Sequence, residues 1–302
     1  VMTRAEIEQI NPASTIDLLR RVPHLDIAEN GNAGGFSYVS VRGGEFNFTL
    51  VMIDGVAVND STNSRGGGFD FNQINPAAIE RVEVYRGGTN TIYGGEAISG
   101  VINIVTRSDS SPTITAEIGS NEQLNVSFTS SARIQENMSI LGSLSTQNKR
   151  VSAFEEVNSH QALGKLTFNA DMADYSLLVT FNQTDTSGFA EDSGGEVFAQ
   201  PLLAESRDSE QWLIGTSGTW ALHKQIDLHA NLSWLNREET SDHPGIVEGV
   251  FSGIPASNIT SEYERAELDL FLNWEPQDTT KVALGGNLRQ QDGENRGFLD
   301  FG

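Results

Sequence analysis

Apolar and polar residues alternate along most of the chain after residue 112. In residues 225–237, every second residue from Ile226 to Trp234 is apolar, and the residues between them are polar. A period of two is typical of a β-strand with one apolar and one polar face. The same alternation, interrupted by turns, predicts nine strands. They cover residues 113–119, 123–134, 138–147, 160–170, 174–184, 210–222, 225–237, 262–275 and 280–291.

The connections between these strands are short and long in turn. The joins at 135–137 and 171–173 are short, whereas those at 185–209 and 238–261 are long. Membrane β-barrels have tight turns on one side, long loops on the other, and apolar side chains facing lipid. A soluble sandwich also has alternating strands, so the loop lengths make the distinction. The pattern favours an antiparallel transmembrane β-barrel.

The first 107 residues have a different pattern. Residues 79–85 alternate as a strand, and residues 101–106 are almost entirely apolar, as in a strand buried on both faces. Between them, residues 86–100 include five glycines, which allow positive φ angles and close backbone approach. Upstream, residues 14–21 form a predicted amphipathic helix that ends before a proline. These elements predict a compact α+β domain.

Five segments of this region stand in the order and spacing of the plug domain of TonB-dependent outer-membrane receptors, a family that the chain resembles. They are residues 15–23, 39–43, 50–56, 79–87 and 93–106. The resemblance implies a plug domain over residues 1–107 and the amino-terminal part of the barrel over residues 108–302. Plugged outer-membrane transporters have 22 strands, so we expect a fragment with about nine of them. The signal peptide, the energy-coupling box and the other barrel strands are expected outside this sequence.

Within this family, several short stretches resemble the vitamin B12 (cobalamin) receptors. They are Glu29-Asn30-Gly31, Val41-Arg42-Gly43, residues 51–56 and Gly119-Ser120-Asn121. Two turns depart from the family pattern. The chain has Pro23-His24 where Pro-Gly is usual, and Gly88 where a proline often follows Arg-Gly. Both are turn positions, so the expected fold is unchanged.

Charge and composition narrow the class of function. The chain of 302 residues carries 19 basic and 41 acidic residues, and most of the excess acidity lies after residue 107. Phosphate binding requires the opposite sign, so we expect no nucleic-acid partner. There is no cysteine and no run of 18 apolar residues that would predict a membrane-spanning helix. The five histidines form no set of metal ligands, and no Gly-x-Ser-x-Gly motif is present, so we expect no enzyme activity.

Two polar loops of the predicted plug have the composition of a contact surface for cargo. Residues 30–38 and 59–68 combine glycines, small polar residues and aromatic rings, and rigid rings bind with little loss of entropy. Arg65 is the only cation in either loop, which favours a neutral, amide-rich cargo such as cobalamin over an anionic ferric siderophore. The candidate cargo-binding residues are Asn32, Phe36, Ser37, Tyr38, Asn59, Ser61, Thr62, Asn63 and Arg65.

Two arginines are candidates for holding the plug in the barrel. Arg42 and Arg86 each precede a glycine at the end of a predicted strand. Such a residue is either an exposed arginine at a strand end or, as the resemblance implies, a plug arginine that pairs with barrel carboxylates. A buried charge requires such a partner.

The long acidic loop over residues 185–208 is a candidate calcium site. It holds six carboxylates within 24 residues, and carboxylates with backbone carbonyls can bind Ca²⁺. The spacing is not that of an EF-hand, and most acidic loops are simply solvated. The resemblance adds that cobalamin receptors use calcium in external loops, although no cofactor is required. The candidate ligands are Asp185, Glu191, Asp192 and Glu196.

The resemblance implies active uptake of a large, scarce nutrient, cobalamin or a ferric siderophore, across the outer membrane of a Gram-negative bacterium. Outer-membrane lipid would surround the strands, and the plug would gate the barrel. TonB, with ExbB and ExbD, would supply the energy. The alternative is a passive porin, or a barrel that serves as an adhesin or phage receptor without energised transport. The energy dependence of uptake separates the two.

Overall fold

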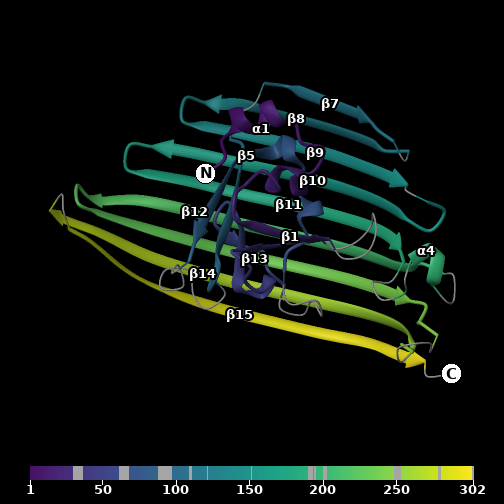
Figure 1. Ribbon diagram of the computed structural model, residues 1–302. Coiled ribbons are helices and arrows are strands. Elements are labelled where there is room, and N and C mark those ends of the chain that lie inside the picture. Colours follow the sequence, from purple (N-terminus) through teal and green to yellow (C-terminus); the bar gives the residue numbers. More distant parts are fainter. Residues whose placement is uncertain are drawn as a thin grey trace.

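The structure, a computed structural model, has two parts (Figure 1). A large sheet of long strands forms one part, and a smaller unit lies against one face of it. We call residues 1–107 the plug and strands β7–β15 the wall. The described residues are 1–29, 37–60, 68–87, 97–108, 111–120, 122–150, 152–189, 193, 195–199, 203–247, 253–277 and 280–300, with the side chains of residues 195, 196, 299 and 300 left undescribed.

The plug begins with two short helices, α1 (Arg4–Ile10) and α2 (Thr15–Leu19). At the start of α1, the backbone N–H of Thr3 donates to Glu6 Oε2 at 2.7 Å, as in a capping box. At the start of α2, the Ser14 hydroxyl accepts a backbone N–H at 3.1 Å, which satisfies one donor of the first turn. The predicted helix is therefore confirmed as α2.

Two small sheets form the rest of the plug. One pairs β1 with β2, and the other has the strand order β4-β3-β6-β5, with β3 and β6 parallel. The central strand β6 is buried along most of its length, as its apolar sequence predicts. The bounds are β1 (Leu25–Glu29), β2 (Ser37–Val41), β3 (Thr49–Ile53), β4 (Val56–Ala57), β5 (Ile79–Arg86) and β6 (Gly100–Thr106), with short 3₁₀ helices η1 (Phe46–Phe48), η2 (Phe71–Gln73) and η3 (Pro76–Ala78).

The wall is a nine-stranded antiparallel sheet in which each strand pairs with its neighbours in sequence. All nine strands expected from the alternation are present, and the expected antiparallel order is confirmed. A short helix, α4 (Gly195–Phe198), lies in the connection between β11 and β12. The strands are β7 (Thr113–Ile118), β8 (Leu124–Gln135), β9 (Met138–Arg150), β10 (Glu156–Ala170), β11 (Ala173–Gly188), β12 (Glu205–His223), β13 (Ile226–His243), β14 (Ala256–Gln277) and β15 (Thr280–Asp300).

The two faces of the wall differ in the way that the alternation predicts. On the outer face, away from the plug, Phe128, Leu144, Ile214 and Leu232 are exposed large apolar side chains. On the inner face, the register aligns the polar residues Gln161, Asn182, Gln211 and Arg237 across four strands. The four tryptophans share the outward set, and Trp212 and Trp274 are among its exposed members. An apolar outer face suits lipid, and a polar inner face suits a wet lumen.

The predicted fold class, an α+β plug followed by antiparallel barrel strands, is confirmed. Several short elements, α1 and β1 among them, were not predicted because each has few apolar positions to mark a period. Across the described ranges, no helix combines the length and apolar character needed to cross a membrane.

Candidate functional site at the interface of plug and wall

Seven plug residues, 54–60, run along the inner face of the wall and contact four of its strands. We call them the clamp segment. It begins in the two-residue turn between β3 and β4, where Asp54 and Gly55 have φ angles of 50° and 82°. Asp-Gly suits such a turn because both central residues of a type I′ hairpin need positive φ. This turn presents the Asp54 carboxylate to the wall.

Lys165 on β10 makes the first charged contact with the clamp segment. Its Nζ lies 3.1 Å from Asp54 Oδ2 and donates to the Thr106 carbonyl oxygen at 3.1 Å. Asp54 accepts hydrogen bonds from the backbone N–H of Thr106, at 2.9 Å, and from its hydroxyl. The two charged side chains are only 8% and 9% exposed. A buried ion pair needs such additional hydrogen bonds, so this contact ties β10 to both the clamp segment and the end of β6.

Arg237 on β13 makes the second contact, at the other end of the clamp segment. Its Nη1 lies 3.4 Å from Asp60 Oδ2, and the side chains are 4% and 7% exposed. Its other terminal nitrogen pairs with Glu239 on the same strand. Burial raises the pKa of the nearby Asp70, while the positive charges of Arg207 and Arg237 oppose that rise. The wall arginines therefore face two buried plug carboxylates.

Arg265 on β14 makes the third contact, to the main chain of the clamp segment. Its guanidinium donates to the carbonyl oxygen of Asn59 at 3.1 Å and to that of Ala57. Glu267 balances the charge, with 3.6 Å between Arg265 Nε and Glu267 Oε2. Glu267 also pairs with Arg289 on β15 at 2.8 Å. A cation on each of three strands thus holds one short stretch of the plug.

Between the charged contacts, the clamp segment packs on apolar wall residues. A Cβ at Gly215 of β12 would lie 2.6 Å from Val56 Cγ2, so the glycine allows Val56 to approach this closely. Leu178, Leu213 and Leu235 of the wall belong to the same buried cluster as the plug core. The interface is therefore apolar in its middle and charged toward its ends.

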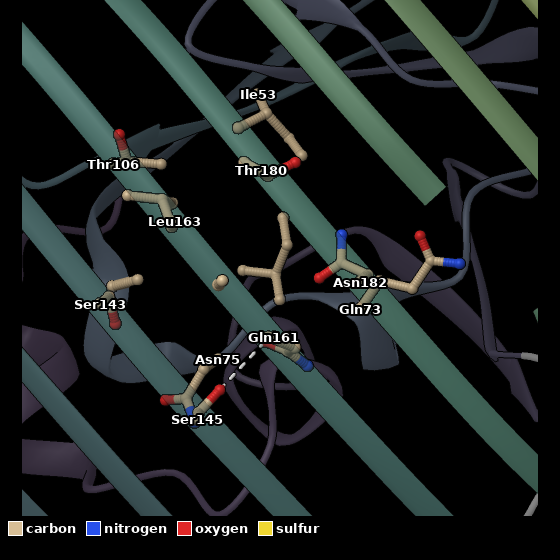
Figure 2. Close-up of a pocket in the computed structure, with 13 residues that line it drawn as sticks. Ile53, Gln73, Asn75, Thr106, Ser143, Ser145, Gln161, Leu163, Thr180 and Asn182 are labelled. Carbon is tan, nitrogen blue, oxygen red and sulfur yellow. Dashed lines mark hydrogen bonds between the residues drawn. The ribbon is translucent and has the colours of Figure 1, made fainter. Parts of the chain in front are cut away.

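A small cavity lies between the plug and strands β9–β11 (Figure 2). Its volume of ≈ 30 Å³ corresponds to about one or two water molecules. Gln73 Oε1 and Thr180 Oγ1 belong to residues that line it, and both atoms lack a partner within the described part of the chain. Ser145 donates to Gln161 Oε1 at 3.4 Å, and Gln161 donates to the carbonyl oxygen of Asn72 in the plug at 2.8 Å. This part of the interface is polar rather than tightly packed.

Three of the candidate cargo-binding residues fall in the described plug. Ser37 and Tyr38 lie in β2 and are 3% and 0% exposed, and the Tyr38 ring stacks on Phe46 at 4.8 Å between centroids. Asn59 donates to the carbonyl oxygen of Thr49 at 3.0 Å. These side chains fill the interior of the plug, and their assignment to a cargo surface stays a prediction. Outside the described residues lie Asn32, Phe36, Ser61, Thr62, Asn63 and Arg65.

The structure places Arg42 and Arg86 on the exposed surface of the plug. Arg86 donates to the carbonyl oxygen of Pro23 at 3.0 Å, which is a contact within the plug. Neither arginine forms an ion pair with the described residues of the wall. Their role as plug anchors stays a prediction. The anchors that the structure does contain have the opposite arrangement, with cations on the wall and carboxylates on the plug.

The proposed calcium ligands are only partly placed. Asp185 lies on β11, in register with Asp208 on β12. Glu191, Asp192 and the side chain of Glu196 lie outside the described set. Among the residues that are described, no group of three or more side chains could hold a metal ion. Calcium therefore stays a prediction.

Comparisons with known proteins identify the first domain of the chain. Residues 1–101 match the family model of the TonB-dependent Receptor Plug Domain. The vitamin B12 transporter BtuB of Vibrio vulnificus is 37% identical over 131 residues, which cover 42% of this chain and 21% of that protein. The matched residues thus span about a fifth of the length of this curated relative.

Solved structures share the fold across nearly the whole chain. The ferripyoverdine receptor of the outer membrane of Pseudomonas aeruginosa matches 98% of this chain and 42% of its own, with a TM-score of 0.80 and 15% identity. The ferric enterobactin receptor of the same organism matches 96% of this chain and 48% of its own, with a TM-score of 0.72 and 17% identity. The copper transporter OprC matches 95% of this chain and 45% of its own, with a TM-score of 0.75 and 12% identity.

Residues 1–101 are therefore a TonB-dependent receptor plug domain, and the chain as a whole has the fold of the plug and the first barrel strands of these receptors. The resemblance drawn from the sequence, including its likeness to a vitamin B12 receptor, is confirmed. The predicted location in the outer membrane of a Gram-negative bacterium is confirmed as well.

Proposed function

We propose that the full-length receptor carries out TonB-dependent active uptake of a large, scarce nutrient across the outer membrane. The observation that carries this proposal is a folded plug held inside the wall by buried, directional contacts from Lys165, Arg237 and Arg265. A passive pore needs no such domain in its lumen. An adhesin or phage receptor needs only external loops.

The rest of the interface supports gating rather than permanent closure. The wall around the three cations presents amides and hydroxyls that water can solvate. Work from the inner membrane could therefore separate part of the plug from the wall, and water would solvate the polar surface that this exposes. TonB, with ExbB and ExbD, is the proposed source of that work, and outer-membrane lipid is the proposed partner of the apolar outer face.

We propose a cobalamin-like cargo. Two observations support it: the resemblance to a vitamin B12 transporter and the near absence of cations in the sequence of the two glycine-rich plug loops. A ferric siderophore is the second candidate, because structures with the same fold include receptors for ferripyoverdine and ferric enterobactin.

The test is uptake by cells that lack their own corrinoid and siderophore receptors and express the full-length protein. We expect labelled cyanocobalamin to accumulate in cells with TonB and to remain outside in cells without TonB or with a collapsed proton-motive force. Accumulation that is independent of TonB would support a passive pore. Accumulation of a ferric siderophore without cyanocobalamin would overturn the proposed cargo.

A further inference from the structure

Strand β13 ends in a turn that leads into the long connection to β14. The turn is His243-Pro244-Gly245-Ile246, and Gly245 has a φ angle of 82°. Proline at the second position and a glycine with positive φ at the third are typical of a type II turn. A side chain at Gly245 would not fit, because its Cβ would lie 2.9 Å from the backbone nitrogen of Ala256. The path of the chain out of the wall is therefore closely defined.

The side chain of His243 takes part in this turn. The backbone N–H of Gly245 donates to His243 Nδ1 at 2.9 Å. Directly after it, Ile246 and Ile254 form an antiparallel bridge with backbone hydrogen bonds of 2.8 and 2.9 Å. The imidazole therefore holds the chain in the conformation from which the start of the connection pairs with its end.

The bond between His243 and Gly245 requires a neutral imidazole. Because a backbone N–H can only donate, Nδ1 must supply a lone pair, and the ring proton must be on Nε2. A protonated imidazole carries a hydrogen on both nitrogens and cannot accept. Histidine is the side chain whose charge ordinarily changes between about pH 5 and 8. Acid therefore removes the acceptor that Gly245 uses.

Glu205 on β12 is a carboxylate beside His243. Ser206 pairs with Asp242 in the register of β12 and β13, so Glu205 comes next to His243 on the inner face. Glu205 accepts from the Ser241 hydroxyl at 3.3 Å, which is long for a bond of this kind. A nearby carboxylate favours the charged form of an imidazole. Glu205 is therefore placed to receive the ring once it is protonated.

The other groups around His243 leave this balance in place. Ser257 on β14 is in register with His243 and is neutral. Asp242 lies on the outer face and adds a negative charge on the same strand. Arg207 on β12 opposes protonation, but it lies two residues beyond Glu205 and so further from His243 along the sheet.

We propose that His243 is an acid-sensitive latch on the connection between β13 and β14. The neutral ring holds the turn through Gly245, and the protonated ring turns to Glu205 and releases it. The long loops of membrane barrels lie on the outer side of the membrane, so the latch responds to the pH of the medium. This inference goes beyond the proposed function, because it depends on neither cargo nor energised transport.

Spin labelling of the full-length receptor in liposomes, with no other cysteine present, tests this inference. Val247→Cys places a nitroxide next to the bridge, at a side chain that is 58% exposed. Between about pH 8 and pH 5, we expect the mobile fraction of its spectrum to rise reversibly by about threefold, the size of shift that one hydrogen bond produces. Val197→Cys is the matched control, because it is exposed on the connection between β11 and β12, which contains no histidine. Its spectrum should not change.

Three substitutions in the protein labelled at residue 247 separate the latch from a merely structural role of His243. His243→Asn keeps a side-chain acceptor for the N–H two residues on and cannot be protonated, so the label should stay ordered in acid. His243→Ala removes the acceptor, so the label should be mobile at both pH values. Glu205→Gln removes the partner of the charged ring, so the transition should move to lower pH.

An unchanged spectrum of the label at residue 247 in acid would overturn the inference. A change of equal size in His243→Asn, or in the control at residue 197, would also overturn it, because another group would then be the cause. If His243→Ala is as ordered at neutral pH as the protein with His243, the bond to Gly245 does not hold the turn. If Glu205→Gln leaves the transition in place, the transfer of the ring to Glu205 is wrong.

Discussion

The two parts of the plug are held in place by different kinds of contact. The later part, from β3 to β6, bonds to the wall through buried charges such as Asp54 and Asp60. The earlier part, from α1 to β2, is packed on the later part through apolar side chains such as Ile7, Ile16 and Leu19. The stabilisation from apolar packing is non-directional and roughly proportional to the buried area. A buried ion pair stabilises the fold only when its two charged groups keep a favourable distance and orientation.

This difference shows how one small domain can be both anchored and displaceable. Contacts that depend on geometry keep a segment in register with the wall, and contacts that depend on area can be lost and regained in stages. Changes at the anchored part should therefore affect docking of the plug, and their sizes should follow the burial and charge of each contact.

The largest effect is expected for Lys165→Met, which leaves Asp54 charged and buried without its cation. Breaking one side of a buried pair typically costs about 3–5 kcal/mol. We expect a loss of this size in the free energy of plug unfolding in the full-length receptor, measured by urea dependence of hydrogen exchange in β3 and β6.

Two further variants sharpen this prediction. Lys281→Met removes an exposed lysine that pairs with Glu275 at 2.6 Å and is 78% exposed, so plug stability should not change. Adding Asp54→Asn to Lys165→Met removes the orphaned charge and keeps a residue that tolerates positive φ, so much of the loss should return. A double variant no more stable than the single one would contradict this account of the pair.

Arg265→Met should have the next largest effect. The carbonyl oxygens of Ala57 and Asn59 lose their donor, and a buried polar group without a partner costs about 1–3 kcal/mol. The same hydrogen-exchange measurement applies. Arg289→Met is the control, because Arg289 pairs with the same Glu267 but is not among the residues that bond to the clamp segment. Equal effects of the two substitutions would show that Arg265 acts through the charge balance of the wall.

Gly215→Ala should weaken docking through overpacking alone. The added Cβ would meet Val56 Cγ2 at 2.6 Å, and we expect a loss of about 1 kcal/mol, at the low end for overpacked sites, because the Val56 side chain can rotate. Gly164→Ala on β10 meets no atom within 4 Å and should be neutral. Adding Val56→Ala to Gly215→Ala should restore stability, because it removes the clash. If it does not, Gly215 is not required for the close approach of β12 and the clamp segment.

The smallest loss of stability is expected for a substitution at Glu83, and this loss should depend on pH. Burial raises the pKa of Glu83, but hydrogen bonds from Asn103, Arg81 and Tyr85 outweigh it, so the net pKa is lowered. Asn103 in turn accepts from Gly55 N–H at 3.1 Å, so ionised Glu83 supports the turn that carries Asp54.

A lowered pKa means that the ionised carboxylate stabilises the fold above the ordinary pKa of a glutamate, and that this stabilisation is lost as pH falls through the lowered value. Glu83→Gln should therefore cost about 1 kcal/mol or less near neutral pH. Stability measured against pH should show the two proteins converging in acid. A constant difference would mean that the charge of Glu83 is irrelevant.

The strands of the wall could be predicted from the sequence because one apolar face and one polar face impose a period of two. The ends of these strands on the side of the long loops could not be predicted. β14 begins at Ala256, before the expected start at residue 262, and β12 begins at Glu205, before the expected residue 210. Beyond the apolar band both faces of a strand are polar, so the alternation that marks it disappears.

The interface with the plug was only partly predictable, for a related reason. The alternation places Arg237 on the inner face, but nothing in the sequence connects it with Asp60 or connects Lys165 with Asp54. These pairs join residues that are far apart along the chain, and tertiary packing alone selects them. The glycine-rich pattern that suggested a loop extends into β2, where Ser37 and Tyr38 are buried.

Hydrogen exchange of the full-length receptor in liposomes, with and without a soluble TonB fragment, tests the central claim most directly. The account predicts that amides of β3 and the clamp segment exchange at least about tenfold more slowly than those of α1 and β1. It also predicts that TonB accelerates exchange only in the earlier part of the plug, from α1 to β2. Equal exchange rates in the two parts, or acceleration of the clamp segment by TonB, would contradict it.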